Sequence, residues 1–265
     1  MNSRGAYPIS LVLSLILLLI LSLLSGCGHR KPASVNVPPP PPASEPSAGT
    51  SRPEGAAKHD RLPAAESEES ADLAEPTIPP DAKPMATETG RASWYGPPYH
   101  NRRGSNGKVY NMHAMTAAHR TLPLGSVVRV TNLKTGQTAL VRITDRGPFI
   151  PGRIIDLSLA AAHKLDVYQP GVAEVKIEVM EAPVPLGSGG KWAVQIGGFP
   201  GEQSAAKLAD HLKRRYRTAK VLKFASPAGD WWVRVRVLDD DRERARKLAA
   251  ETETSDGAVF LVRLD

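Results

Sequence analysis

The sequence predicts a multidomain chain in which a small, mainly β barrel precedes an α+β domain. Residues 91–180 hold many short apolar segments that end in Gly, Pro, Asn or Asp, a pattern typical of barrels. Residues 191–265 alternate strand-like and helix-like patterns, which favours one sheet covered by helices on a single face. Pro-rich and Gly-rich segments at 27–90 and 181–190 precede the two domains. We therefore expect two folded domains joined by disordered linkers.

Residues 1–26 predict a secretory signal peptide. Arg4 precedes an apolar run from Leu11 to Leu24, which is shorter than the roughly 20 residues that a membrane-spanning helix needs. Leu24-Ser25-Gly26-Cys27 closes this run and resembles a bacterial lipobox. We expect Cys27 to carry the lipid, palmitate included, that anchors the mature chain to a membrane. The alternative is a signal anchor with an incidental cysteine.

The predicted anchor places the folded domains in the cell envelope. Each buried methylene of a lipid chain strengthens membrane binding by about 0.8 kcal/mol, so several chains together hold a protein durably. Gly28, rather than an aspartate, follows the cysteine, which indicates the outer membrane if the host has one. Because Cys27 is the sole cysteine, we expect the domains to fold without disulfides.

The charge of the chain indicates its partner class. The formal net charge is +7, although the linker at 27–90 is rich in acids. Basic proteins often bind nucleic acid, but an exported protein meets little of it, so we expect no nucleic-acid partner. The acidic polymer outside the membrane is the cell wall. A Pro-rich linker extends by about 3.1 Å per residue, so it can hold a domain away from the membrane and near that polymer.

Within the barrel, strand-like segments and one Ala-rich helix can be placed by their patterns. A Gly-containing turn at residues 133–137 joins the first two strands as a hairpin. The expected elements are the strands Val127–Asn132, Thr138–Thr144, Ile154–Leu157 and Val175–Val179 and the helix Leu159–Leu165.

Three titratable residues lie at or near the ends of these segments. Asp145 follows a strand directly and precedes Gly147-Pro148, so it either caps a turn or faces a cleft. His119 follows a run of small residues, where a structural histidine is the alternative. Asp156 lies among apolar strand residues and needs partners if it is buried, with Arg153 as a candidate. We give Asp156 mainly a structural role, beside a role in the site.

The motifs ASWYG, NGKVYN, MTAAH, TLPLGS, VRVTNL, TDRGPF and GRIIDLS follow one another between residues 92 and 158. In this order they resemble the catalytic domain of the rare lipoprotein A (RlpA) family. The resemblance implies a double-psi β-barrel and an endolytic peptidoglycan transglycosylase, a lyase. It also implies catalytic roles for Asp145, His119 and Asp156.

The reaction that the resemblance implies is cleavage of the β-1,4 bond between N-acetylmuramic acid and N-acetylglucosamine. An acid protonates the leaving oxygen, and the same or a second group removes the proton of the muramyl 6-hydroxyl. That oxygen then attacks the anomeric carbon, so a 1,6-anhydro end forms without water. Ordinary glycosidases use a carboxylate pair.

Two positions depart from the pattern of the family. Lys108 stands where the family typically carries a glutamate, and Asn111 replaces a usual aspartate. An ammonium group near Asp145 would favour its ionised form and weaken it as an acid. We therefore expect either slow cleavage or binding without cleavage if Lys108 faces Asp145. If Lys108 faces solvent, Asp145 suffices.

Four aromatic residues near the expected cleft offer faces on which sugars can stack. They are Trp94, Tyr95, Tyr99 and Tyr110. Packing in the core is the alternative, and we expect it for Trp94.

The C-terminal segments follow the order βαββαβ, as in a ferredoxin-like domain. The strands are Trp192–Gly197, Lys220–Phe224, Trp231–Leu238 and Val259–Arg263, and the helices are Gln203–Tyr216 and Asp240–Glu251. Alternation places Trp192, Val194 and Ile196 on the face toward the helices, with Gln195 and Phe199 on the other face. It also places Trp232 and Arg234 on the open face, where an exposed Trp beside Arg and Gln would form a sugar-binding platform.

The segments VQIGGF and WVRV resemble the SPOR domain, a family that binds glycan strands stripped of stem peptides and gathers at the division septum. The resemblance implies glycan-binding roles for Gln195, Trp232 and Arg234. A generic ferredoxin-like module is the alternative.

Together these features predict a lipid-anchored transglycosylase that acts at the septum on peptidoglycan strands lacking stem peptides, with division proteins as further partners. The alternative from another class is a non-catalytic or weakly active peptidoglycan-binding lipoprotein. The sequence holds no metal-binding cluster and no phosphate-binding loop, so we expect no metal and no cofactor.

Overall fold

The computed structural model describes residues 74–224, 226, 228–254 and 257–265. The expected signal peptide, Cys27 and most of the first linker lie outside the described residues. Within the described part, none of the helices is both long and apolar enough to cross a bilayer.

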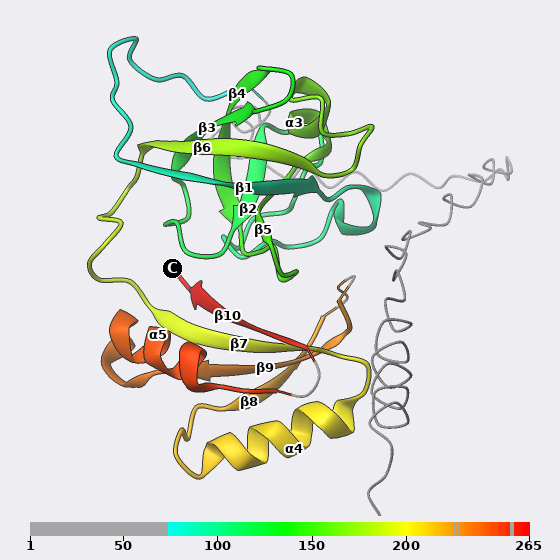
Figure 1. Ribbon diagram of the computed structural model, residues 1–265, viewed down its shortest axis with the longest axis vertical. Helices are drawn as coiled ribbons and strands as arrows, with labels where there is room; N and C mark the ends of the chain where they lie inside the picture. The colour runs from blue at the N-terminus through cyan, green and yellow to red at the C-terminus, as the bar shows by residue number, and fades with distance from the viewer. Residues whose placement is uncertain (1–73, 225, 227, 255–256) are drawn as a thin grey trace, which may run out of the picture. The chain divides into compact units, whose positions relative to one another are not determined.

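The N-terminal domain is a closed barrel of six strands in the order β1-β5-β2-β4-β3-β6 (Figure 1). Its elements are β1 (Ala86–Trp94), η2 (Pro97–Tyr99), β2 (Thr116–His119), β3 (Val127–Asn132), β4 (Thr138–Asp145), β5 (Arg153–Leu157), α3 (Leu159–Lys164) and β6 (Ala173–Glu181). The four predicted strands and the predicted helix are confirmed. The mainly β barrel is therefore the fold that the sequence indicated.

Two strands of the barrel escaped the sequence pattern for different reasons. The first half of β1 is exposed and polar, so it shows no alternation of apolar and polar residues. β2 has four residues, all buried, and the first three are Thr, Ala and Ala. Yet β2 pairs with both β4 and β5, so it joins the two strands that carry the candidate carboxylates.

Branched apolar side chains of facing strands fill the barrel. Val128, Val141 and Ile155 are among its fully buried residues. Burying a side chain of this size contributes about 1.5–3 kcal/mol. Ser158 caps helix α3 by accepting a hydrogen bond from the Ala161 amide at 3.2 Å. The core is therefore rigid enough to hold the strand ends in fixed positions.

The C-terminal domain is a four-stranded antiparallel sheet in the order β10-β7-β9-β8 (Figure 1). Its elements are β7 (Trp192–Phe199), α4 (Glu202–Lys213), β8 (Lys220–Lys223), β9 (Trp231–Arg236), η3 (Leu238–Asp240), α5 (Arg242–Glu251) and β10 (Ala258–Arg263). The predicted order βαββαβ is confirmed.

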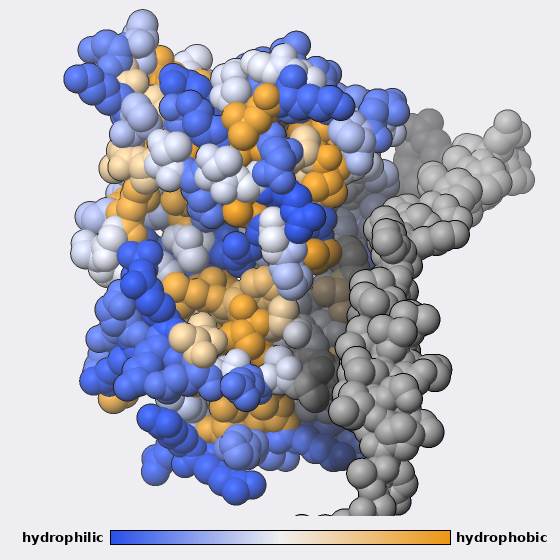
Figure 2. All heavy atoms as spheres, in the orientation of Figure 1, coloured by the Kyte–Doolittle hydropathy of each residue, from blue (hydrophilic) through white to orange (hydrophobic). Residues whose placement is uncertain are grey.

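Both helices pack against the same face of this sheet. Ala205 and Ala209 of α4 join Ala245 and Leu248 of α5 in one buried cluster with Trp192 and the alternate residues of the strands. The outward side of α5 is charged, and Figure 2 shows hydrophilic side chains gathered there. The helix sequences thus separate an apolar stripe from a polar surface, as amphipathic helices do.

A bulge in β7 changes the face of one predicted residue. Phe199 was expected on the open face, but it belongs to the buried cluster beneath the helices. The register of β7 against β9 shifts between Gly197 and Phe199, and Gly198 has a φ of 88°. Because one extra residue reverses the alternation along a strand, the bulge turns Phe199 toward the helices. A side chain at Gly197 would meet the Trp231 carbonyl oxygen at 2.8 Å, so the bulge requires glycine there.

Candidate functional site

Two carboxylates flank Ala118 on neighbouring strands of the barrel. Ala118 of β2 is paired with Asp145 of β4 on one side and with Asp156 of β5 on the other. Paired residues on adjacent strands point to the same face of a sheet. All three residues line one cavity. The register of three strands therefore brings together two acids that lie eleven positions apart in the sequence.

Asp145 is held through one of its two oxygens. Its Oδ1 accepts hydrogen bonds from the Ser105 amide at 2.9 Å, from the Ser105 hydroxyl, and from the Arg146 amide at 2.7 Å. Oδ2 has none of these bonds. This carboxylate is thus fixed in orientation by a loop forty residues earlier in the chain, with Oδ2 as its remaining functional oxygen.

Asp156 has a different environment. Burial raises the pKa of its carboxyl group above the usual range, and the nearby charge of Arg153 and the bond from Ser93 offset this only in part. The Ser93 hydroxyl donates to Asp156 Oδ1, and Arg153 donates to the same hydroxyl. Arg153 Nη1 lies 4.0 Å from Asp156 Oδ1. The predicted partnership with Arg153 is confirmed, and Ser93 joins the two groups.

Aromatic side chains form part of the same cavity. Trp94, Tyr95, Tyr99 and Tyr110 all line it. Tyr95 and Tyr110 stack at 4.3 Å between ring centroids, and the Tyr110 hydroxyl donates to the Tyr95 carbonyl. Burial raises the pKa of all three tyrosines, so they stay neutral phenols. Trp94 also packs against the barrel core, as expected.

His119 lies outside the residues that line this cavity. Its Nδ1 accepts hydrogen bonds from the amides of Thr121 at 3.2 Å and Leu122 at 3.1 Å, so the proton of the neutral ring is on Nε2. Nε2 lies 3.4 Å from a carboxylate oxygen of Glu88, a long contact. Burial lowers the pKa of His119, while the hydrogen bond to the ring lowers that of Glu88. The pair therefore consists of a neutral imidazole and an ionised carboxylate.

The contacts of His119 indicate a positioning role. Its ring orders the turn after β2, and Arg146 donates to the carbonyls of His119 and Leu122 at 3.1 and 2.6 Å. Arg146 directly follows Asp145, and its amide is one of the three donors to that carboxylate. His119 thus acts on the site through the turn and Arg146 rather than by contact.

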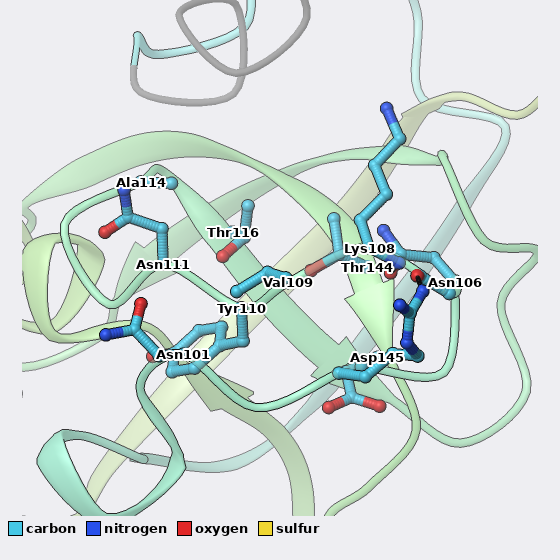
Figure 3. A pocket seen from close by; sticks show the side chains of 13 residues that line it. Asn101, Asn106, Lys108, Val109, Tyr110, Asn111, Ala114, Thr116, Thr144 and Asp145 are labelled. Atoms are coloured by element: carbon cyan, nitrogen blue, oxygen red, sulfur yellow. Dashed lines mark hydrogen bonds between the residues drawn. The ribbon is translucent and has the colours of Figure 1, made fainter. Parts of the chain in front are cut away.

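Residues of the loop from Asn101 to Asn111 line a second cavity. The second cavity has a volume of about 480 Å³, and Asp145 and Tyr110 line both cavities. Lys108 and Asn111, the two positions that depart from the family pattern, line the second cavity. In Figure 3 the Lys108 side chain extends away from the Asp145 carboxylate. Of the two arrangements that the sequence left open, this orientation favours the one in which Lys108 does not face Asp145.

Among the described residues, no group of three or more His, Cys, Asp or Glu side chains could hold a metal ion.

On the open face of the C-terminal sheet, the predicted platform is buried. Trp232 is fully buried, stacks on Phe224 at 5.2 Å with an interplanar angle of 10°, and lies beside Phe260. Its indole N–H donates to the Gly229 carbonyl at 3.0 Å. The face assigned to Trp232 is confirmed, because Trp232, Phe260 and Val262 form a cluster apart from the helices. The expected exposure of Trp232 is wrong, because neighbouring aromatic rings cover it.

Gln195 and Arg234 form a pair on this face. Gln195 is fully buried, and its Oε1 accepts two bonds from Arg234, at 3.1 and 2.7 Å. The expected exposure of Gln195 is therefore also wrong. Arg234 is half-buried and is the one of the three predicted residues that reaches the surface.

Comparisons with known proteins agree with this architecture. Residues 87–177 match the family model described as lytic transglycolase, and residues 188–260 match the SPOR domain. The chain joins a lytic transglycolase domain to a SPOR domain. Both site carboxylates lie within the matched part of the lytic transglycolase domain.

Curated relatives bear the name endolytic peptidoglycan transglycosylase RlpA. The Vibrio cholerae protein is 56% identical over 99 residues, which cover 37% of this chain and 38% of that protein. The Helicobacter pylori protein is 39% identical over 160 residues, or 50% of this chain and 51% of that protein. The Neisseria meningitidis protein is 58% identical over 92 residues, or 35% and 38%. The matches thus span about half the length of these relatives or less.

Solved structures resemble the chain only distantly. A Clavibacter michiganensis expansin has 16% sequence identity and a TM-score of 0.29, covering 58% of this chain and 81% of that protein. A Streptomyces papain inhibitor has 23% identity and a TM-score of 0.30, covering 38% of this chain and all of that protein.

The sequence did not point to two residues of the lytic transglycolase domain that hold its carboxylates. Ser93 contacts Asp156, and Ser105 contacts Asp145. Serine is common in loops and on strands, so its type alone carries no signal. Its spacing from the acids in the sequence, 63 and 40 residues, also hides the contact.

Proposed function

We propose that the lytic transglycolase domain cleaves the β-1,4 bond between N-acetylmuramic acid and N-acetylglucosamine in peptidoglycan strands that lack stem peptides. One observation carries the proposal: Asp145 and Asp156 of this domain flank Ala118 and line one cavity. The names of the three relatives support the same reaction.

Asp156 is the acid in this proposal. Burial raises the pKa of its carboxyl group, which favours the protonated form that a general acid needs. Asp156 gives its proton to the glycosidic oxygen, and the bond from that oxygen to the anomeric carbon breaks. The N-acetylglucosamine 4-hydroxyl leaves with the proton. Interpretation of the sequence placed the acid at Asp145, and the raised pKa moves this role to Asp156.

Asp145 stabilises the positive charge that develops at the anomeric carbon. Hydrogen bonds to Oδ1 fix the orientation of this carboxylate, and Oδ2, which accepts none of these bonds, is the oxygen that faces the charge. The muramyl 6-hydroxyl oxygen then attacks that carbon and closes the 1,6-anhydro ring. Asp156, now ionised, takes the proton of this hydroxyl and returns to its starting form. One proton leaves the acid and one returns, so no water is consumed.

The SPOR domain concentrates the enzyme on its substrate by holding the same glycan strand. Tethering converts the second encounter into an intramolecular one. Arg234 supports this role as the half-buried cation of the open face. A lipid at Cys27 and a Pro-rich linker would keep both domains at the envelope, enriched at the septum near division proteins. This placement rests on the sequence motifs alone.

The test is to incubate the full chain in detergent micelles with peptide-free glycan strands and analyse the products by mass spectrometry. We expect new 1,6-anhydro ends that vanish with Asp156→Asn. Intact strands that still sediment with the protein would reject the enzyme and leave a binding protein.

That second candidate, a non-catalytic peptidoglycan-binding lipoprotein, is favoured by Lys108 and Asn111 alone. Lys108→Glu separates the two functions. If the lysine suppresses cleavage, the variant gains activity; because the Lys108 side chain extends away from Asp145, we expect no gain in the yield of anhydro ends from peptide-free strands.

A further inference from the structure

Apart from Asp145, the residues that line the second cavity of the lytic transglycolase domain have no role in the chemistry above. It measures about 480 Å³, within the range of roughly 300–1,000 Å³ that is usual for ligand sites. Asp145, Tyr110, Arg103 and Gly104 line it and also line the cavity that holds Asp156. A chain of sugars that passes Asp145 can therefore occupy both.

We propose that this cavity is a sugar subsite that takes a sugar unit bearing a carboxylate. The inference rests on the proposed function, because it assigns the neighbour of the sugar that reacts at Asp156.

Neutral polar groups of the cavity suit the hydroxyl and acetamido groups of a sugar. Asn101 and Asn111 contribute amides, which both donate and accept hydrogen bonds (Figure 3). Thr116 is only 4% exposed, yet its Oγ1 has no hydrogen-bond partner among the described residues. Buried hydroxyls are normally paired, so this one has capacity for a ligand or an ordered water.

The charges of the cavity select the carboxylate. Among the described residues that line it, Asp145 is the sole acid, whereas Arg103 and Lys108 are basic. Arg103 donates to the Gly107 carbonyl and so braces the loop that carries Lys108. Lys108 thus brings a positive charge to the wall of the cavity, and a cation pairs favourably with a carboxylate.

Two sources could supply that carboxylate in peptidoglycan. N-acetylmuramic acid has a lactyl carboxylate of its own, which is free once the stem peptide has been removed. A strand that keeps its peptides carries carboxylates on the peptide instead.

The experiment measures binding without turnover, using the full chain in detergent with Asp156→Asn as the background. The probes are a peptide-free oligosaccharide of N-acetylglucosamine and N-acetylmuramic acid, the same oligosaccharide with its lactyl carboxylates reduced to alcohols, and a peptide-bearing one. Calorimetry at low salt gives the dissociation constants. The SPOR domain is the same in every variant, so differences between variants report on the barrel.

We expect the carboxylate form to bind about fivefold more tightly than the alcohol form, with Lys108→Glu removing this preference. Lys134→Glu makes the same change of charge on an exposed turn and should leave the preference intact. The other source is the stem peptide. If the peptide-bearing oligosaccharide binds more tightly than both peptide-free probes, and Lys108→Glu removes this difference, the carboxylate belongs to the stem peptide. Equal binding of all probes, or a preference that survives Lys108→Glu, would overturn the subsite.

Thr116→Val provides a second measurement that does not depend on charge. Because the hydroxyl is unpartnered, we expect the Tm to be unchanged and all three probes to bind more weakly by a similar factor. A fall in Tm with unchanged binding would assign Thr116 to the fold and remove it from the subsite. If anhydro ends form but no carboxylate preference is found, this inference is rejected and the proposed function stands. If the preference is found but no anhydro ends form, the cavity binds the carboxylate and the proposed cleavage is rejected.

Discussion

The carboxylate cavity of the barrel and the open face of the C-terminal sheet received similar predictions from the sequence, yet they differ in the structure. In the barrel, Asp145 and Asp156 line one cavity. On the sheet, Trp232 and Gln195 were expected at the surface and are fully buried. Only Arg234 keeps part of its surface exposed.

The difference teaches how polar and aromatic residues respond to close packing. A carboxylate needs hydrogen-bond donors, and Ser93 and Ser105 supply them while both acids still line the cavity. An indole ring gains more by stacking on Phe224 than by facing water. Alternation along a strand therefore predicts the face of a residue but not whether neighbours on that face cover it.

Removing either carboxylate is the largest test of the barrel side of this comparison. We expect Asp156→Asn and Asp145→Asn each to lower the rate of anhydro-end formation by at least about 100-fold. Asp166→Asn changes an exposed aspartate of the same barrel and serves as the control. The measurement is product yield from peptide-free strands by mass spectrometry. If all three variants lose the same amount of activity, the loss comes from the change in net charge and not from the positions of Asp145 and Asp156.

The Trp232 ring tests the sheet side. Trp232→Ala should lower the free energy of unfolding by about 3–5 kcal/mol, because it leaves a hole between Phe224 and Phe260. Leu238→Ala removes an exposed side chain and should cost no more than about 0.5 kcal/mol. Denaturant unfolding measures both. Loss of glycan binding at unchanged stability would restore the idea of an exposed platform.

His119 distinguishes positioning from chemistry within the barrel. His119→Leu leaves the amides of Thr121 and Leu122 without an acceptor, which should cost about 2 kcal/mol of stability. His119→Asn keeps an acceptor near the Nδ1 position, so stability and the pH profile of cleavage should both largely recover. A catalytic histidine would instead lose activity in both variants, and the pH profile would change shape.

The pH dependence of stability is the smallest expected effect and sharpens the assignment of the acid. The raised pKa of Asp156 means that the native state holds this proton more tightly than the unfolded chain does. Its stabilising effect is therefore complete at low pH and declines as pH rises through the ordinary carboxyl range to the raised pKa. The Tm of Asp156→Asn relative to the unchanged protein should then increase as pH rises above the ordinary carboxyl range. A Tm difference that does not change with pH would contradict the raised pKa of Asp156.

The sequence by itself determined much of the architecture. Short apolar segments with turn residues between them predicted four barrel strands, and the alternating pattern of the C-terminal region predicted βαββαβ. Both signals are local, because a strand or helix repeats its pattern within one segment. Asp145 and Asp156 could also be singled out, since each lies at or near the end of a strand with a clear apolar pattern.

Tertiary structure alone decided the rest. Only the pairing of β2 with β4 and β5 places the two carboxylates on either side of Ala118. Only packing buries Trp232, and only a bulge of one residue turns Phe199 toward the helices. The loop of residues 101–111 likewise sets Lys108 apart from Asp145 (Figure 3). Each outcome depends on residues far apart in the sequence, and a local pattern contains no information about such contacts.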